Sequence, residues 1–218
     1  MSESILKERG HALISQIEVE GLTKSFDRLP RDPFIEGNFR FRRLSRFIAP
    51  NGQLRALPHK NFMQTEYYNH LLGNIRREYQ EMEADVALSD AFIQLLDSIA
   101  KSLAVDLKTS VFGAHQIRIT AENGRGGEPA PEGIHKDGFD FVTVTCINRQ
   151  GVVGGKTELY ENKENAPVFS EILNPGQTLL CDDRKLFHFT TPVSLEEGLD
   201  YGTRDVIVVT VKTGVSLN

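Results

Sequence analysis

Six short strand-like runs fill the second half of the chain, and no helix-like segment separates them. Each run is rich in β-branched, aromatic or other apolar residues, and Gly, Pro or Asn punctuate the sequence between them. Consecutive parallel strands need long crossover segments, usually helices. We therefore expect an antiparallel sandwich or small barrel rather than a βαβ fold. The predicted strands are Val111–Thr120, Phe139–Ile147, Lys156–Tyr160, Gln177–Asp182, Lys185–Phe189 and Arg204–Lys212.

The first half of the chain contains one clear amphipathic helix. Between Leu88 and Leu103 the apolar residues recur at the spacing of one helical face, and Ser89 is placed to cap the N-terminus. The stretch Glu66–Met82 is also compatible with a helix, although Gly73 weakens that prediction.

Two earlier runs, His11–Ile17 and Phe39–Ile48, are strand candidates that would extend the predicted sheets. No linker is long enough to divide the chain. We expect a single domain over residues 1–218, with helical and edge-strand support at about 1–108 and a β-rich core at about 109–214. The fold class is mainly β (α+β) with flanking helices.

Composition excludes several functional classes. The 25 Lys and Arg residues against 30 Asp and Glu residues give a net charge of −5, so we expect no nucleic-acid partner. Cys146 and Cys181 show neither zinc-knuckle spacing nor a disulfide framework and are expected to be core thiols. The sequence has no apolar run near 18 residues and begins with a polar segment, so we expect a cytoplasmic protein with no membrane contact.

The segment His135-Lys136-Asp137 is the first candidate for chemistry. In an extended segment residues i and i+2 point to the same side, so the imidazole and the carboxylate can converge on one metal ion. On its own, this tripeptide fits a surface His–Asp hydrogen bond better than a metal site.

His188, inside the apolar run 186–189, changes that balance. A lone histidine there would be read as a core residue. Two histidines and one carboxylate on separate strands of a small barrel, however, form the facial triad of non-haem Fe(II) oxygenases, which leaves open positions for substrate and O₂. Because no thiolate accompanies them, this donor set favours iron over a structural zinc site.

Arg204 follows at the start of the last apolar strand, in phase with Val206 and Val208. An arginine at a strand end can simply extend to solvent. Its planar fork of donors is also suited to binding the far carboxylate of a dicarboxylate whose other end chelates a metal.

Taken together, the runs HKD (135–137), FHFTTP (187–192) and GTRD (202–205) resemble the signature of Fe(II)/2-oxoglutarate-dependent dioxygenases. The sequence is most similar to the bacterial branch that hydroxylates free L-amino acids, the L-isoleucine 4-hydroxylase-like enzymes. Three features carry this finer resemblance, namely HQIR at 115–118, RFRRLSR at 40–46 and the Gly154-Gly155 pair.

The resemblance implies a double-stranded β-helix (jelly-roll) core and hydroxylation of a small, amino-acid-like molecule. Fe(II) would be held by His135, Asp137 and His188, and 2-oxoglutarate would bind the iron and Arg204. It would be converted with O₂ to succinate and CO₂, with ascorbate as an optional reductant. A homodimer is left open.

Strand parity places Gln116 and Arg118 on one face of their strand, and we expect that face to point into the barrel. A bound substrate or co-substrate could satisfy them, and so could an internal salt bridge to a residue such as Glu158. We assign Gln116 and Thr143, beside Arg204, to co-substrate binding, and Arg118 and Arg42 to the substrate.

Arg40, Arg42 and Arg46 form a one-sided row that suggests an anion site or, equally, a solvated edge strand. The Gly- and Pro-rich loop Glu122–Gly133 ends at the HKD segment and is expected to act as a mobile lid.

Two other functions remain compatible with these residues. One is a cupin-like binding protein that keeps the barrel but has no turnover, and the other is a hydroxylase of protein or peptide side chains. Release of succinate from 2-oxoglutarate distinguishes the first from an enzyme.

Overall fold

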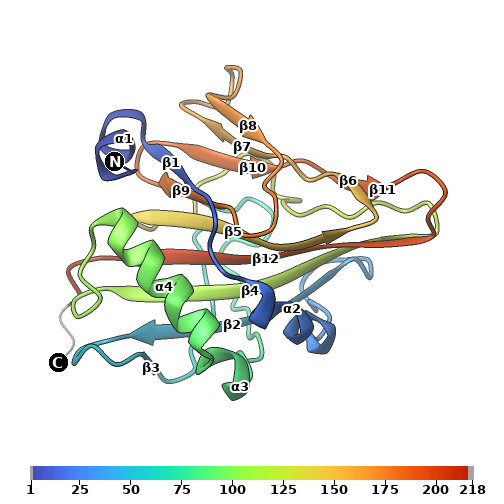
Figure 1. The fold of residues 1–218 in the computed structure, drawn as a ribbon. Helices are drawn as coiled ribbons and strands as arrows, with labels where there is room; N and C mark the ends of the chain where they lie inside the picture. The colour runs from blue at the N-terminus through green and yellow to red at the C-terminus, as the bar shows by residue number, and fades with distance from the viewer. Residues whose placement is uncertain (1, 216–218) are drawn as a thin grey trace.

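The computed structural model describes residues 2–215, and a seven-stranded antiparallel sheet forms its centre (Figure 1). The strands lie in the order β1-β9-β5-β12-β4-β2-β3. Their bounds are β1 (His11–Ile14), β9 (Thr178–Asp182), β5 (Phe141–Gln150), β12 (Tyr201–Lys212), β4 (Val111–Glu122), β2 (Arg40–Ile48) and β3 (Arg55–Ala56). The expected extension of the sheet by early strands is confirmed, because β1 pairs with β9 and β2 pairs with β4.

Two smaller antiparallel sheets complete the β structure. One has the order β10-β7-β8 and the other pairs β11 with β6. Their bounds are β10 (Phe187–Thr190), β7 (Thr157–Tyr160), β8 (Phe169–Glu171), β11 (Val193–Leu195) and β6 (Val152–Gly154). The prediction of a mainly β, antiparallel fold of jelly-roll type is confirmed.

The helices cover one face of the large sheet (Figure 1). They are α1 (Ser2–Arg9), α2 (Glu20–Thr23), the 3-10 helix η1 (Lys24–Arg28), α3 (Ala84–Ala87) and α4 (Asp90–Leu103). Helix α4 is the predicted amphipathic helix, and the Ser89 side chain accepts a hydrogen bond from the Phe92 backbone N–H as its cap. Among the described residues, no helix has the length and apolar character that a membrane crossing requires.

The alternation of side chains along the strands separates two interiors. Phe112 and Ala114 of β4 and Val209 of β12 pack in the core against α4. The intervening residues, such as Ile117 of β4 and Val208 of β12, line a cavity on the other face of the sheet. Because side chains of a strand alternate between faces, one layer provides stability and the other encloses a site.

The helix considered for Glu66–Met82 is wrong. The Asn69 side chain accepts hydrogen bonds from the backbone N–H groups of Leu71 and Leu72, which favours a turn over a helix. A Cβ on Gly73 would lie 2.3 Å from the Glu66 Cα, so this turn brings backbone against backbone. After the turn, Arg77 pairs with Phe62 as an isolated bridge.

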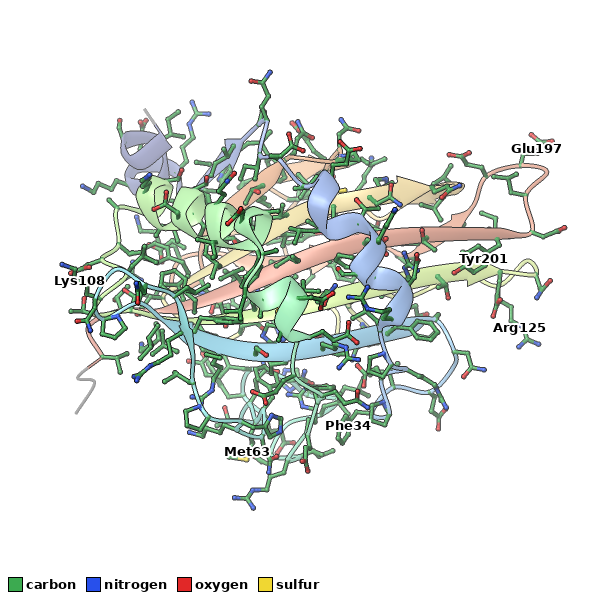
Figure 2. All side chains as sticks on the ribbon, turned by 60° about the horizontal axis from the view of Figure 1, so that its bottom comes forward. Phe34, Met63, Lys108, Arg125, Glu197 and Tyr201 are labelled. Atoms are coloured by element: carbon green, nitrogen blue, oxygen red, sulfur yellow. The ribbon has the colours of Figure 1, made fainter. Side chains whose placement is uncertain are left out.

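Long loops and hairpins project at one end of the molecule, where Arg125, Glu197 and Tyr201 lie together, opposite Lys108 (Figure 2). The segment that contains Met63 lies on the other side of β2 from α4 (Figure 2). This segment therefore packs on the cavity face of the large sheet, to which it contributes lining residues.

Both cysteines, Cys146 and Cys181, are buried and unbridged, as expected of core thiols. Burial raises the pKa of both thiols.

Candidate metal centre and its cavity

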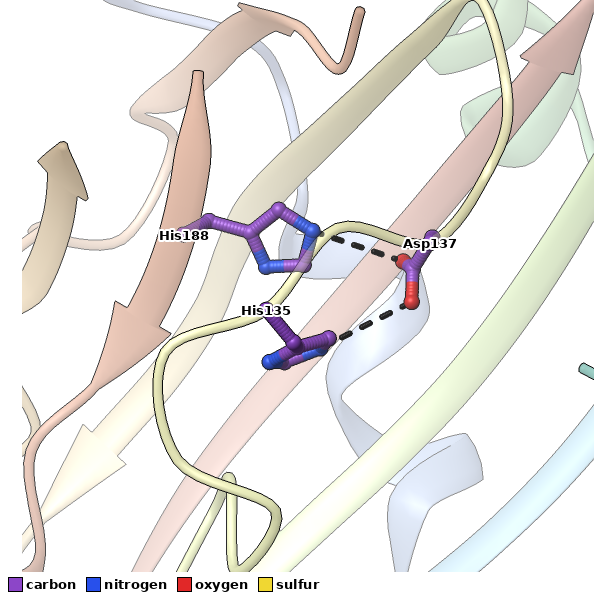
Figure 3. A group of neighbouring side chains, drawn as sticks. All are labelled: His135, Asp137 and His188. Atoms are coloured by element: carbon purple, nitrogen blue, oxygen red, sulfur yellow. Dashed lines mark ion pairs between the residues drawn. The ribbon is translucent and has the colours of Figure 1, made fainter. Parts of the chain in front are cut away.

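The structure brings His135, Asp137 and His188 together at the cavity (Figure 3). One ligand atom from each lies within 4.8 Å of those of the other two. The Asp137 carboxylate lies beside the two rings, with Oδ1 3.6 Å from His135 Nε2 and Oδ2 3.7 Å from His188 Nε2. The convergence of His135 and Asp137, predicted from their two-residue spacing, and the addition of His188 to this donor set are both confirmed.

Backbone pairing places the two histidines side by side. His135 and His188 exchange both backbone hydrogen bonds, at 3.0 and 2.8 Å, so β10 is tied to the segment that carries Asp137. The Nδ1 of His135 lies 2.8 Å from the Gly133 carbonyl oxygen. Since a carbonyl can only accept, Nδ1 carries the proton and Nε2 is left with a free lone pair facing the cluster.

Two further residues hold Asp137 in place. Asp183 accepts hydrogen bonds from the backbone N–H groups of Asp137, Gly138 and Phe139. Gln64 donates from Nε2 to Asp137 Oδ1 at 2.8 Å. Partners of this kind orient metal ligands in proteins.

The electrostatics at the cluster favour a bound cation. Burial tends to lower the pKa of His188, but the carboxylates of Asp183 and Asp137 outweigh it and raise that pKa. His188 Nε2 is buried and faces carboxylate oxygens of Asp183 at 3.4 Å and of Asp137 at 3.7 Å. Glu132 adds a carboxylate 3.3 Å from His135 Nε2. Two imidazole nitrogens that face several carboxylates form an environment that a divalent metal would satisfy, so the donor set fits Fe(II).

Comparison with known families settles the class of protein. A family model described as 2OG-Fe dioxygenase matches residues 23–210. The chain belongs to the 2OG-Fe dioxygenase family. It is therefore an oxidoreductase, and the cofactor and co-substrate of the family are Fe(II) and 2-oxoglutarate. The alternative of a binding protein without turnover is set aside. No curated protein matches the chain.

Solved structures of other proteins are similar to this 2OG-Fe dioxygenase over nearly its whole length. A bsmA homolog from Methylobium petroleophilum PM1 is 28% identical, with a TM-score of 0.82, covering 100% of this chain and 94% of that one. IDO from Bacillus thuringiensis is 19% identical, with a TM-score of 0.78 and coverage of 97% and 94%. The Fe(II)/(alpha)ketoglutarate-dependent dioxygenase TqaL is 16% identical, with a TM-score of 0.71 and coverage of 99% and 86%. The last two likenesses concern the fold.

Arg204 of the dioxygenase lies in the same cavity as the metal cluster and is 3% exposed. Among the described residues it has no ion-pair partner, and its Nη2 has no hydrogen-bond partner. Burial, with a contribution from nearby Arg149, lowers the pKa of Arg204 to about 10, so the side chain stays charged at neutral pH. A buried guanidinium without a counter-ion is suited to an anionic ligand.

Gly155 leaves the space in which the Arg204 side chain lies. A Cβ at this position would lie 2.9 Å from Arg204 Cδ, and the backbone has a φ of +65°. Both observations require glycine here. Gly154, the other member of the pair that carries the family resemblance, also has a positive φ of +76°, and a Cβ there would lie 2.3 Å from the Pro192 carbonyl oxygen.

The expected orientation of Gln116 and Arg118 is wrong. Both face away from the cavity, toward the helices. Gln116 donates to Ser25 Oγ, and Arg118 forms a bidentate pair with buried Asp205 at 2.7 and 2.8 Å. The strand parity was assigned correctly, but it is the other face, with Ile117, that lines the cavity. The alternative of an internal salt bridge was right in kind, although the partner is Asp205 rather than Glu158.

Thr143 is also misplaced as a co-substrate ligand. Its neighbours across the strands, Leu180 and Val209, belong to the core against α4, whereas the adjacent residues Val142 and Val144 line the cavity. Since alternate residues of a strand face opposite sides, Thr143 points into the helix-covered core.

The three arginines predicted to form a one-sided row on β2 do not all reach the cavity. Arg40 and Arg42 line the cavity and are buried, whereas Arg46 lies outside it and donates to the Pro58 carbonyl. Arg40 donates to Asp32 at 2.8 Å through both Nε and Nη2. The solvated edge-strand alternative is wrong, because β2 lies between β4 and β3 and Arg46 is half-buried.

Sequence reasoning missed several residues around the cavity, among them Gln64, Arg77, Glu132 and Asp183. The position of Arg77 at the cavity was not predicted because its segment was expected to form a helix. The two-residue spacing of Arg77 from Tyr79 was the available signal, since the Tyr79 ring packs against Arg42 of β2 and Arg77 donates to Gln64 in the same cavity.

The loop after β4 is anchored partway along. Gly127 and Val193 exchange backbone hydrogen bonds at 2.9 Å, which fixes the first part of the loop. Beyond this anchor, Pro129, Ala130 and Glu132 line the cavity. The part that could cover the site is therefore the stretch 128–133.

Proposed function

We propose that this dioxygenase hydroxylates a C–H bond of a free L-amino acid or a closely related small molecule. The observation that carries the proposal is a buried, unpaired Arg204 in the same cavity as His135, Asp137 and His188. Metal donors and an anion-binding group then share one cavity, as the binding of one chelating dicarboxylate requires.

The assigned roles follow from the donor chemistry. His135, Asp137 and His188 would hold Fe(II). When bound, Fe(II) and 2-oxoglutarate supply the activation of O₂, one oxygen atom entering the substrate as hydroxyl and the other entering succinate as CO₂ is lost. Gln64 and Asp183 would keep the Asp137 carboxylate and its backbone in position.

Arg204 would bind the distal carboxylate of 2-oxoglutarate. Val206 and Val208 follow it on the same face of β12 and give the cavity an apolar floor. An apolar, water-poor surrounding strengthens the ion pair and keeps water from the reacting centre.

The choice of an amino-acid-like substrate rests on the arginine-rich segment 40–46, in which this chain resembles the free L-amino-acid hydroxylases. Two of its arginines, Arg40 and Arg42, line the cavity. The motif at 115–118 gives weaker support, because Gln116 and Arg118 serve the packing of the sheet.

We also propose that residues 1–218 act as one catalytic domain. The early strands β1 and β2 belong to the same sheet as the strands beneath the cavity. Removing either would expose the backbone of β9 or β4.

A mass-shift screen tests the function. The purified protein with Fe(II), 2-oxoglutarate and ascorbate is incubated with each of the twenty L-amino acids, and products heavier by about 16 Da, one oxygen atom, are sought together with succinate. We expect at least one hydroxylated product. Succinate without any hydroxylated amino acid would refute the substrate class, and no succinate at all would refute the assigned chemistry.

Variants test the ligands. Changing His135, Asp137 or His188 to alanine should abolish Fe(II)-dependent succinate formation and leave the circular dichroism spectrum unchanged, because each side chain faces the cavity rather than the core. His59→Ala is the matched control, since His59 lies outside this cavity beside Glu78. Full activity in any of the three variants would remove that residue from the ligand set.

A further inference from the structure

A wall of three arginines lines the same cavity as the metal cluster. Arg40 and Arg42 come from β2, and Arg77 comes from the segment beyond β2. All three are almost fully buried, with exposures of 6%, 6% and 2%. The wall is therefore part of the site and not a solvated surface.

The wall carries more positive charge than the protein neutralises. The carboxylate that pairs with this wall is Asp32. Arg40 donates to it at 2.8 Å, whereas the nearest nitrogen of Arg42 is 3.9 Å from the same carboxylate oxygen. Arg77 forms no ion pair among the described residues. Burying unmatched charge is costly unless a ligand completes the pairing.

Arg42, which shares Asp32 with Arg40, and Arg77 are both held in fixed positions, and each keeps an unused N–H donor. Arg42 stacks over the Tyr79 ring at 4.0 Å, and Arg77 stacks over the Phe62 ring at 4.7 Å. The Nε atoms of Arg42 and Arg77 are buried and have no hydrogen-bond partner. Aromatic stacking therefore fixes the guanidinium planes while polar edges remain unused.

His115 adds a neutral donor to the wall. Its Nδ1 contacts Arg42 Nη2, and because a guanidinium can only donate, Nδ1 must accept and Nε2 must carry the proton. Burial and the charges of Arg42, Arg77 and Arg40 hold the pKa of His115 well below its usual value. The ring therefore does not add a further positive charge.

The remaining charges of the cavity do not neutralise this wall. Asp137 and Glu132 lie at the metal cluster, where a bound divalent cation would neutralise their charges. Arg204 lines the same cavity and is assigned to the carboxylate of 2-oxoglutarate. Gln64 separates the wall from the cluster, since it accepts from Arg77 at 2.8 Å and donates to Asp137 at 2.8 Å. The group that would neutralise Arg42 and Arg77 must therefore come from the substrate.

We infer that Arg42 and Arg77 form a subsite for the substrate's carboxylate, distinct from the 2-oxoglutarate site at Arg204. This deepens the proposed function, on which its assignment to a substrate rests. It follows that the substrate is an acid whose carboxylate points toward β2, and that the ammonium group of an amino acid points away from the wall. Carboxamides and amines of the same shape should bind poorly.

Binding measured without turnover tests the subsite. The protein is loaded with Fe(II) and 2-oxoglutarate in the absence of O₂, and each L-amino acid and its carboxamide are titrated by calorimetry. We expect at least one acid to bind, and its carboxamide to bind at least tenfold more weakly. Equal binding of acid and amide, or no binding of any acid at 10 mM (roughly 3 kcal/mol of affinity), would overturn the inference.

Variants locate the subsite on the wall. Arg77→Gln should weaken binding of the acid at least tenfold and leave the affinity for 2-oxoglutarate unchanged. Arg42→Lys keeps the positive charge but loses the planar fork of donors, and it provides a second measurement should Arg77→Gln fold poorly. This variant should also weaken binding of the acid at least several-fold. Arg46→Gln, on the same face of β2 but outside the cavity, is the matched control. Parent-like binding of the acid by both wall variants would overturn the inference.

The subsite and the proposed function can fail separately. Hydroxylation of an amino acid that is unaffected by Arg77→Gln and Arg42→Lys would preserve the function and reject the subsite. Tight, wall-dependent binding of an acid that is never hydroxylated would preserve the subsite and reject the amino acid as substrate.

Discussion

Substituting Gly155 with alanine should weaken 2-oxoglutarate binding without altering any residue proposed to touch it. The new Cβ would lie 2.9 Å from Arg204 Cδ and 3.2 Å from Arg204 Nε, and ordinary contact begins at 3.4 Å. Arg204 would have to shift by about 0.5 Å, the tolerance within which a binding geometry must be held.

The expected loss of 2-oxoglutarate affinity follows from the hydrogen bonds that a displaced Arg204 would no longer make. A hydrogen bond to a charged group contributes about 1.5–3 kcal/mol. Losing one at the displaced guanidinium lowers the affinity for 2-oxoglutarate by about ten- to a hundredfold. Alanine at a φ of +65° also costs about 1–2 kcal/mol of folding free energy, which lowers the Tm by several degrees.

A second glycine separates these two effects. Gly198 has a φ of +81°, and a Cβ there would meet nothing within 4 Å. Gly198→Ala should therefore lower the Tm in the same way and leave 2-oxoglutarate binding unchanged. Calorimetric titration of 2-oxoglutarate into the Fe(II)-loaded, oxygen-free protein measures the affinity. If Gly155→Ala lowers the Tm but binds 2-oxoglutarate like the parent, Arg204 is not the anchor.

Three further predictions follow from the same structure. Arg204→Lys should weaken 2-oxoglutarate binding by about ten- to a hundredfold while Fe(II) affinity barely changes, since lysine keeps the charge but loses the fork; equal affinity would place the anchor elsewhere. The stretch 128–133 should become protected from limited proteolysis when Fe(II), 2-oxoglutarate and an amino acid bind, and identical cleavage would indicate an inert loop. Asp205→Ala should lower the free energy of unfolding by about 1.5–3 kcal/mol in chemical denaturation, because Arg118 loses its buried bidentate partner and keeps only its ion pair with Asp27. Exposed Asp85→Ala should have little effect, and a similar loss in both would contradict this reasoning.

The parts of the fold that depend on local pattern could be predicted from the sequence. Helix α4 has a regular apolar stripe and a serine cap, and the structure shows both. The convergence of His135 with Asp137 followed from the two-residue repeat of an extended segment. These features depend on residues close together in the chain.

The parts that failed depend on contacts between distant segments. The parity of β4 was correct, but choosing which face met the helices required knowing that Arg118 would find Asp205 across the sheet. Likewise, the register of β5 against β12 shifts between Asp205 and Val206, which places Arg149 directly opposite Arg204. A bulge of this kind has no reliable signal in one sequence.

Arg77 shows a related limit. Its segment has the composition of a helix, and the turn that prevents one depends on the Asn69 side chain and on close backbone packing at Gly73. A tertiary arrangement overrides local propensity there, and with it the chain gains a residue at the cavity.

The two-sided character of β4 also indicates how this enzyme could be re-engineered. His115 and Ile117 face the cavity, whereas Phe112 and Ala114 pack the sheet against α4. A library that randomises the first set and preserves the second would vary the shape of the binding space while the folded scaffold tolerates the changes. Because these two sets of residues alternate along one strand, substrate recognition can be varied at one set while the other set maintains stability.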